Sequence, residues 1–352
     1  MEPVGVYVHI PFCRRRCDYC AFATWTDREH LIESYLDALA LDVRRAVEGG
    51  LGPVATVFVG GGTPSLVPPE RLVEALARLE LVDGAEVTVE CNPDDVTAHL
   101  LATYRAGGVN RISLGVQSMD DLVLQALGRS HDRANVERAV GLARQLGGLD
   151  VNLDLIYGGA GEAVEQWRRT VEAVVSLRPD HVSAYALTIE PGTPLADDPA
   201  RFPDDDDQAD KYLVADELLS AAGFENYEIS NWSRPGQECR HNLLYWRQGD
   251  YVGFGCAAHS HRAGRRWWNV RTPERYIAAV EAGTSTERGA EELDPEARRV
   301  EGLQLSIRTS DGVPARSVPA DVEHLTEVGL DGRARLTRDG RLLANEVAVR
   351  LS

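Results

Sequence analysis

Three cysteines, Cys13, Cys17 and Cys20, lie within eight residues near the start of the chain. Their spacing puts three thiolates in a single loop, where together they can hold one metal centre. Three ligands are one fewer than the four that close a tetrahedral zinc site or a [4Fe–4S] cluster. The pattern therefore predicts either a fourth ligand from elsewhere in the chain or a metal position that stays open for chemistry. Because the trio is tight, metal binding is favoured over disulfides.

The cysteine loop follows a short β-branched run and opens a series of alternating strand-like and helix-like segments. We expect strands at 4–10, 55–59, 85–90, 111–116, 151–156 and 181–186, and helices at 30–48, 68–79, 97–106, 132–145, 162–177 and 208–222. This alternation predicts a parallel sheet with right-handed crossovers. Six units are fewer than the eight of a closed barrel, so the expected fold is α/β, an open partial (β/α)6 barrel.

A chain of 352 residues fits such a barrel together with a smaller domain. We place the barrel domain at 1–235 and a mixed α/β, winged-helix-like domain at 236–352. In the second part we expect helices at 273–282, 295–308 and 341–351, and turns at Asp331-Gly332 and Asp339-Gly340. The acidic run at 204–207 is expected to be a solvated loop, with a cation site as the alternative.

The composition restricts the functions and locations that we expect. The net charge of −18 argues against a nucleic-acid partner, because phosphate binding needs clustered cations. No apolar run approaches the ~20 residues that span a bilayer, and the first residues lead into a strand rather than a signal peptide. We therefore expect a cytoplasmic protein without a membrane span. Lys211 is the only lysine, so any lysine-based mechanism is confined to that position.

Polar residues and glycines recur where the expected parallel strands end. A glycine run at 60–62 follows the second strand, Glu90 ends the third, Gln117 follows the fourth and Asp154 lies in the fifth. Sites in parallel β/α sheets lie at these carboxyl ends. Glu90 or Asp154 alone is more often a hydrogen-bond anchor, but their joint position favours a ligand site. The glycine run alone indicates a turn, yet here it would let a ligand approach the backbone.

The cysteine loop after a strand, followed by Gly60-Gly61-Gly62-Thr63-Pro64, resembles the radical S-adenosylmethionine (SAM) superfamily. The resemblance implies that three thiolates hold three irons of a [4Fe–4S] cluster. It also implies that SAM chelates the fourth iron through its amino and carboxylate groups, and that its reduction releases a 5′-deoxyadenosyl radical. A zinc site is the alternative that the cysteines alone leave open.

Three further segments make the chain similar to the family of oxygen-independent coproporphyrinogen III oxidase and its relatives. They are Tyr7-Val8-His9-Ile10-Pro11-Phe12-Cys13, Gly115-Val116-Gln117-Ser118 and Asp154-Leu155-Ile156-Tyr157-Gly158. The resemblance implies SAM contacts from Tyr7, Gly61, Gly62, Thr63, Glu90, Gln117, Arg129 and Asp154. Among these, Arg129 suits the carboxylate, whereas Glu90 and Asp154 suit ribose hydroxyls or the methionyl amine.

Two features distinguish the oxidase from the heme chaperones related to it. The oxidase has a further cysteine two residues after the third cluster ligand, and Phe22 occupies that position here. The segment His241-Asn242-Leu243-Leu244-Tyr245-Trp246 resembles a signature of the heme chaperones. His241 is therefore the candidate heme ligand, with aromatic residues to pack on a porphyrin. An aromatic-rich turn is also ordinary interface core, and the alternative iron ligands are His259 and His261, then Cys239 and Cys256.

Three functions stay open at this point. The first is a heme chaperone that carries a [4Fe–4S] cluster and SAM and delivers heme to an unidentified acceptor protein, with a membrane-associated acceptor among the options. The second is an enzyme, the oxidase itself, which converts coproporphyrinogen propionates to vinyl groups. The third is another radical SAM reaction on an unknown substrate. Whether any radical reaction is catalysed does not follow from the sequence.

Overall fold

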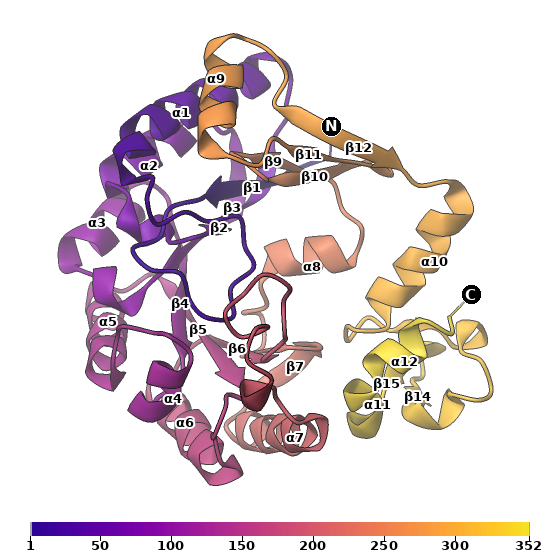
Figure 1. Cartoon of the computed structure of the whole chain (residues 1–352). Coiled ribbons are helices and arrows are strands. Elements are labelled where there is room, and N and C mark those ends of the chain that lie inside the picture. Colours follow the sequence, from indigo (N-terminus) through magenta and orange to yellow (C-terminus); the bar gives the residue numbers. More distant parts are fainter. Residues whose placement is uncertain (1, 352) are drawn as a thin grey trace.

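Six parallel strands form the centre of the fold in a computed structural model that describes residues 2–351 (Figure 1). They are β1 (Val4–Ile10), β2 (Val54–Gly61), β3 (Leu81–Cys91), β4 (Arg111–Gln117), β5 (Asp150–Tyr157) and β6 (His181–Ala186). The strands pair in chain order, each parallel to the next. β1 and β6 do not pair with each other, so the barrel is open, as the alternating pattern predicts.

Helices connect these strands and cover the outer face of the sheet (Figure 1). They are α1 (Ile32–Glu48), α2 (Pro69–Leu76), α3 (Ala98–Ala106), α4 (Asp121–Ala126), α5 (Arg133–Leu146), α6 (Val164–Ser176) and α7 (Asp205–Ala221). Asp132 caps α5, as predicted, by accepting a hydrogen bond from the Asn135 amide at 2.9 Å. Among the described residues, no helix is long and apolar enough to cross a bilayer.

Two of the predicted loops and turns are wrong for the same physical reason. The acidic run at 204–207 is the N-cap and first turn of α7, where the Asp204 carboxylate accepts a hydrogen bond from the Asp207 amide at 2.9 Å. Carboxylates satisfy the free amides and the positive end of a helix at this position. Asp339-Gly340 likewise lies inside a short helix, α11 (Arg338–Leu342), which Thr337 caps. The six-residue α4 was not predicted.

The sheet continues on both sides of the six parallel strands, and on one side the added strands come after residue 235, where we expected the barrel domain to end. The added strands are β9 (Tyr251–Phe254), β10 (His259–Arg262), β11 (Arg265–Asn269) and β12 (Glu287–Glu292) beside β1, and β8 (Asn231–Ser233) and β7 (Glu225–Glu228) beside β6. β9 runs parallel to β1, and the other added strands are antiparallel to their neighbours. This addition protects an edge of β1 that an open barrel would expose. The division into two domains at residue 235 stays a prediction.

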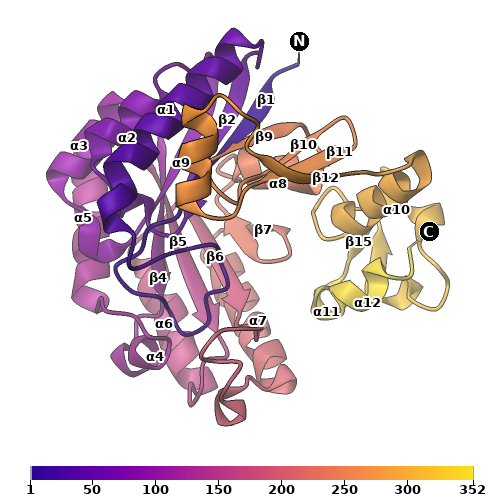
Figure 2. The same cartoon turned by 45° about the horizontal axis from the view of Figure 1, so that its top comes forward.

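The C-terminal part forms a small mixed α/β unit beside the barrel (Figure 2). It contains α10 (Pro295–Ser306), β13 (Val313–Pro314), β14 (Thr326–Val328), β15 (Arg333–Leu336), α11 and α12 (Ala344–Ala348). The unit has its own apolar core around Ile307, Val313 and Val347. Arg341 ties it to α7 by donating to the Asp216 carboxylate at 2.9 Å. Two further helices belong to the same stretch of chain as the added strands. α8 (Arg240–Trp246) precedes β9, and α9 (Pro273–Glu281) connects β11 to β12.

Candidate cofactor pocket and the cavity beside it

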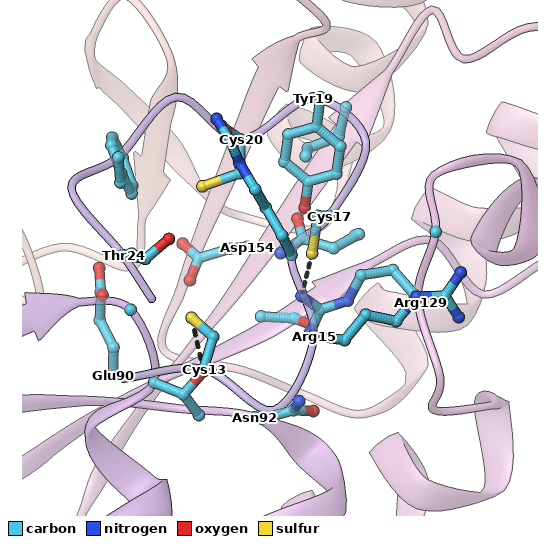
Figure 3. Close-up of a pocket in the computed structure, with 18 of the residues that line it drawn as sticks. Cys13, Arg15, Cys17, Tyr19, Cys20, Thr24, Glu90, Asn92, Arg129 and Asp154 are labelled. Atoms are coloured by element: carbon cyan, nitrogen blue, oxygen red, sulfur yellow. Dashed lines mark hydrogen bonds between the residues drawn. The ribbon is translucent and has the colours of Figure 1, made fainter. Parts of the chain in front are cut away.

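A cavity of about 840 Å³ opens at the carboxyl ends of the parallel strands, under the cysteine loop (Figure 3). It collects ten of the predicted site residues from four strand ends and two loops. They are Cys13, Cys17, Cys20, Gly61, Gly62, Thr63, Glu90, Gln117, Arg129 and Asp154. The expectation that the strand ends converge on one site is therefore confirmed for these residues. Tyr7 and His241 do not line this cavity.

The cysteine loop is fastened to the barrel on both sides. The His9 Nε2–H donates to the Ala23 carbonyl at 2.9 Å, so the last turn of the loop is tied to β1. The Cys13 amide donates to the Trp25 carbonyl at 3.1 Å, and Arg14 forms an ion pair with Asp95. Sequence reasoning assigned no role to His9, although it lies in the strand that leads into the loop. A polar side chain in an otherwise apolar strand was the feature of the sequence that could have indicated this role.

The three thiols point into a common space beside Asp154 (Figure 3). Thr63 Oγ1 donates to Cys13 Sγ at 3.6 Å, and Arg129 Nη1 donates to Cys17 Sγ at 3.4 Å. Burial raises the pKa of the Cys13 and Cys20 thiols, so metal binding would have to displace their protons. Within residues 2–351, no three His, Cys, Asp or Glu side chains are gathered as around a single metal ion.

Glycines at the end of β2 keep the floor of the pocket free of side chains. A Cβ on Gly62 would lie 2.6 Å from the Phe12 carbonyl oxygen and 3.0 Å from Cys13 Sγ. A Cβ on Gly60 would lie 2.9 Å from Glu90 Oε2. Gly61 adopts φ of +110°, which favours glycine. The glycine run therefore lets the cysteine loop and Glu90 approach the backbone of β2 closely.

Two partly buried carboxyl groups lie on the barrel side of the pocket. Glu90 accepts a hydrogen bond from the Gly61 amide at 3.2 Å, and burial together with Asp154 raises its pKa to about 8. Asp154 accepts from Ser113 Oγ at 2.6 Å and from Asn152 Nδ2 at 2.7 Å, and burial raises its pKa as well. A positively charged group that entered the pocket would favour the ionised form of both acids.

Gln117 and Arg129 complete the rim beyond β4. Gln117 has φ of +66°, a left-handed conformation that is uncommon for a side chain and that occurs here at the end of a strand. Arg129 Nη2 donates to the Gly115 carbonyl at 3.1 Å, so the guanidinium is held between β4 and the cysteine loop. A guanidinium held in this way is suited to bind a carboxylate. The three cysteines and the two acids line the same pocket. The set fits a [4Fe–4S] cluster with one open iron and an amino-acid ligand on that iron.

Replacement of Glu90 by Gln is expected to make the ligand-free protein relatively more stable as the pH rises from about 5 to about 8. The carboxyl pKa of about 8 in the folded state lies above the ordinary value of 4.5, so the folded wild type binds more protons across this window. The unfolding free energy of the wild type should therefore fall by up to about 1.4 kcal/mol per pH unit as the pH rises. The amide of the Glu90→Gln variant does not titrate, so it adds no such pH dependence.

Urea unfolding of both proteins at pH 5.5 and pH 8 measures this difference. Glu172→Gln, at an exposed position of α6, is the matched control. A stability difference between wild type and the Glu90→Gln variant that is the same at both pH values would contradict the prediction.

A second cavity of about 970 Å³ lies beside the first, between β1, the added strands, α8 and α10. Ala21 and Phe22 line both cavities, and Phe22 keeps 65% of its surface exposed. Tyr7 faces this second cavity, and its hydroxyl donates to His9 Nδ1 at 3.1 Å. Tyr7 does not line the cysteine pocket, but burial and the neighbouring Glu90 raise the pKa of its hydroxyl, so the implied contact with SAM stays a prediction. His259 and His261 line the second cavity too.

His241 is fully buried, and both of its ring nitrogens are hydrogen-bonded. Nδ1 bonds to Thr56 Oγ1 at 2.8 Å and Nε2 to the Tyr245 hydroxyl at 2.7 Å, while the ring stacks on Phe58. Burial lowers its pKa to about 3. No lone pair is left for iron, so the geometry does not support His241 as the heme ligand. His241 instead fits the other interpretation of the aromatic segment, in which its side chains are part of the buried core.

The two weaker ligand candidates are buried away from both cavities. Cys239 Sγ donates to the Glu86 carboxylate at 3.6 Å, and burial raises its pKa to about 12. Cys256 Sγ accepts a hydrogen bond from the Tyr35 hydroxyl at 3.7 Å. Neither residue lines the first or the second cavity.

Residues 7–174 match the model of the radical SAM superfamily. Among solved structures, coproporphyrinogen III oxidase (HemN) from Escherichia coli, a radical SAM enzyme, superposes with a TM-score of 0.85. The superposition covers 99% of this chain and 89% of that chain at 23% identity, which establishes a shared fold. The fold and the match define the class as a radical SAM protein.

The curated relatives narrow the class. Heme chaperone HemW from Mycobacterium tuberculosis (strain H37Rv) is 43% identical, over 98% of this chain and 94% of the relative. Heme chaperone HemW from Bacillus subtilis (strain 168) is 32% identical over 97% of both chains, and that from Escherichia coli (strain K12) is 41% identical over 74% of this chain and 70% of the relative. The chain therefore belongs to the HemW family of heme chaperones within the radical SAM superfamily.

Proposed function

We propose that this protein is a heme chaperone, which binds heme and delivers it to an acceptor protein while it carries a [4Fe–4S] cluster and SAM. The observation that carries the proposal is 43% identity, over almost the whole of both chains, to a relative named as a heme chaperone. Phe22 adds to it, because the resemblance to the oxidase implies a cysteine at this position. We expect delivery to take place in the cytoplasm.

In this proposal the first cavity holds the cluster and SAM. Cys13, Cys17 and Cys20 would bind three irons, and SAM would bind the fourth through its amino and carboxylate groups. Arg129 would pair with the carboxylate, and Glu90 and Asp154 would accept hydrogen bonds from the amine or the ribose hydroxyls. The bound and reduced pair supplies a 5′-deoxyadenosyl radical in members of the superfamily that react. The chain itself supplies orientation and a buried environment.

A second candidate function is the oxidase reaction on coproporphyrinogen III. It is favoured by the TM-score of 0.85 to that oxidase and by a pocket that retains all three cysteines and both acids. In that reaction a hydrogen atom would pass from a propionate side chain to the 5′-deoxyadenosyl radical, the bond to the carboxylate would break with release of CO₂, and the remaining electron would pass to an added electron acceptor, which leaves a vinyl group. The phenylalanine at position 22 weighs against it, since it cannot act as the cysteine does.

One anaerobic experiment separates these functions. Reconstituted protein with a verified cluster is divided into two portions; one receives hemin, and the other receives SAM, a reductant, an electron acceptor and coproporphyrinogen III. The chaperone predicts a Soret band with stoichiometric heme uptake and no protoporphyrinogen. Protoporphyrinogen formation would support the oxidase instead. Release of 5′-deoxyadenosine without either outcome would support another radical SAM reaction and would contradict our proposal.

A further inference from the structure

We propose that the second cavity is the heme-binding site of this chain and that His261 binds the iron through Nε2. This inference rests on the proposed function, because it takes heme as the cargo. The cavity volume of about 970 Å³ is within the range of sites that enclose ligands of this size. The cavity is separate from the cysteine pocket, and only Ala21 and Phe22 line both.

Aromatic side chains line one face of the added strands. His259 on β10 lies directly opposite Trp268 on β11, and Trp268 lies opposite Gly289 on β12. The indole of Trp268 covers this glycine, since a Cβ there would lie 2.7 Å from the ring. Tyr251, on the strand that pairs with β1, and Phe22 of the cysteine loop line the same cavity. Flat aromatic surfaces of this kind stack on a macrocycle such as a porphyrin.

His261 is the histidine whose hydrogen bonding leaves a ring nitrogen available to bind iron. Its side chain is buried, and its Nδ1–H donates to the Gly249 carbonyl at 2.9 Å. This hydrogen bond fixes the tautomer, so Nε2 carries the lone pair, as in most histidines that bind metals. Within residues 2–351, Nε2 has no hydrogen-bond partner. His259 differs, because it is exposed at the mouth and stacks on Trp268 with ring centroids 5.8 Å apart.

Two arginines give the cavity a charge that suits the propionates of heme. Arg271 and Arg288 line the cavity, and neither forms an ion pair with another residue between 2 and 351. Arg266 also lines it but is paired with Glu291 and Glu301. Arg288 is the extra residue of a β-bulge in β12, which turns a side chain out of the regular alternation. In a chain with a net charge of −18, two free cations at one rim favour an anionic ligand.

The aromatic segment of α8 contributes to this cavity through Tyr245 and not through His241. Tyr245 lines the cavity, and its ring packs on Tyr251 with centroids 4.6 Å apart. The hydrogen bond from its hydroxyl to His241 Nε2 holds that ring in the wall. His241 is therefore a positioning residue for the heme site.

The test is an anaerobic titration of cluster-loaded protein with hemin, read by the Soret band and by electron paramagnetic resonance of the ferric heme. His261→Gly is expected to lose the histidine-ligation signal, and added imidazole is expected to restore it. His259→Ala, two residues away on the same face, is the matched control and should keep the signal. His241→Gln should weaken binding but keep the signal, because His241 does not touch the iron.

The double variant Arg271→Gln/Arg288→Gln changes only exposed residues, so it tests the site even if a histidine variant fails to fold. We expect about tenfold weaker hemin binding, a smaller dependence on salt and an unchanged ligation signal. If the wild type takes up no hemin, the proposed function fails. If it binds hemin and the His261 and arginine variants match it in affinity and signal, the location is wrong and the proposed function stands. Loss of the signal in the His259 variant alone would refute His261 as the ligand.

Discussion

Replacing Cys17 with alanine is expected to remove the [4Fe–4S] cluster and SAM binding almost completely. A cluster held by only three thiolates has no protein ligand to spare, because its fourth iron must stay open for SAM. The side chain also accepts a hydrogen bond from Arg129 at 3.4 Å, so its loss disturbs the candidate carboxylate site as well. The same result is expected for Cys13→Ala and Cys20→Ala. Iron, acid-labile sulfide and equilibrium binding of SAM after reconstitution measure the effect.

Cys91→Ala is the control for this series. Cys91 also borders the pocket, but its thiol is buried and its Sγ donates to the Val89 carbonyl at 3.7 Å. Burial raises its pKa strongly, which keeps the thiol protonated. The control variant should retain the full content of iron and sulfide. A Cys17→Ala protein with a complete cluster and normal SAM binding would refute the ligand assignment.

Lys211→Met is expected to destabilise the protein by about 3–5 kcal/mol, because it leaves a buried carboxylate without its cation. The only lysine of the chain is fully buried in α7. Its Nζ donates to the Glu162 backbone carbonyl at 2.6 Å, lies 3.6 Å from the Glu162 carboxylate and is paired with Asp207. Lys211 is thus a structural cation between α7 and the loop that precedes α6, and it lies in neither cavity.

Chemical unfolding of wild type and variants in the same buffer measures this loss. The double variant Glu162→Gln/Lys211→Met is the variant to compare with Lys211→Met, because it removes the buried carboxylate of Glu162 together with the lysine. The double variant should recover part of the stability that the single variant loses. A single Lys211→Met variant within 1 kcal/mol of the wild type would show that the buried pair contributes little.

The parallel strands could be predicted because strands buried on both faces are nearly continuous apolar runs, as in β2 (Val54–Gly61). Helices with a cap and a long apolar face, such as α5, were equally readable. α4 was missed because six residues carry too little periodicity. The acidic start of α7 was misread because a charge run is ambiguous between a solvated loop and a helix N-terminus.

The first cavity could be predicted from the sequence because most of its site residues lie at or just after the carboxyl ends of expected strands, whereas Arg129 followed only from the family resemblance. The second cavity could not, since it depends on the pairing of β9 with β1, which joins Gly5 to Tyr251. No local pattern indicates such a contact. The same pairing explains why Tyr7 lines the second cavity. The burial of His241 depends on Thr56 and Phe58 in β2, which are also far from it in the sequence.

We propose that one chain holds a cluster with SAM in the cysteine pocket and heme in the neighbouring cavity at the same time. The most direct measurement is an anaerobic hemin titration of cluster-loaded protein with SAM bound, followed by analysis of iron, sulfide, SAM and heme in the same gel-filtered sample. We predict about one heme per chain, with the cluster and SAM fully retained. Heme uptake that expels the cluster or SAM, or no uptake, would contradict the account.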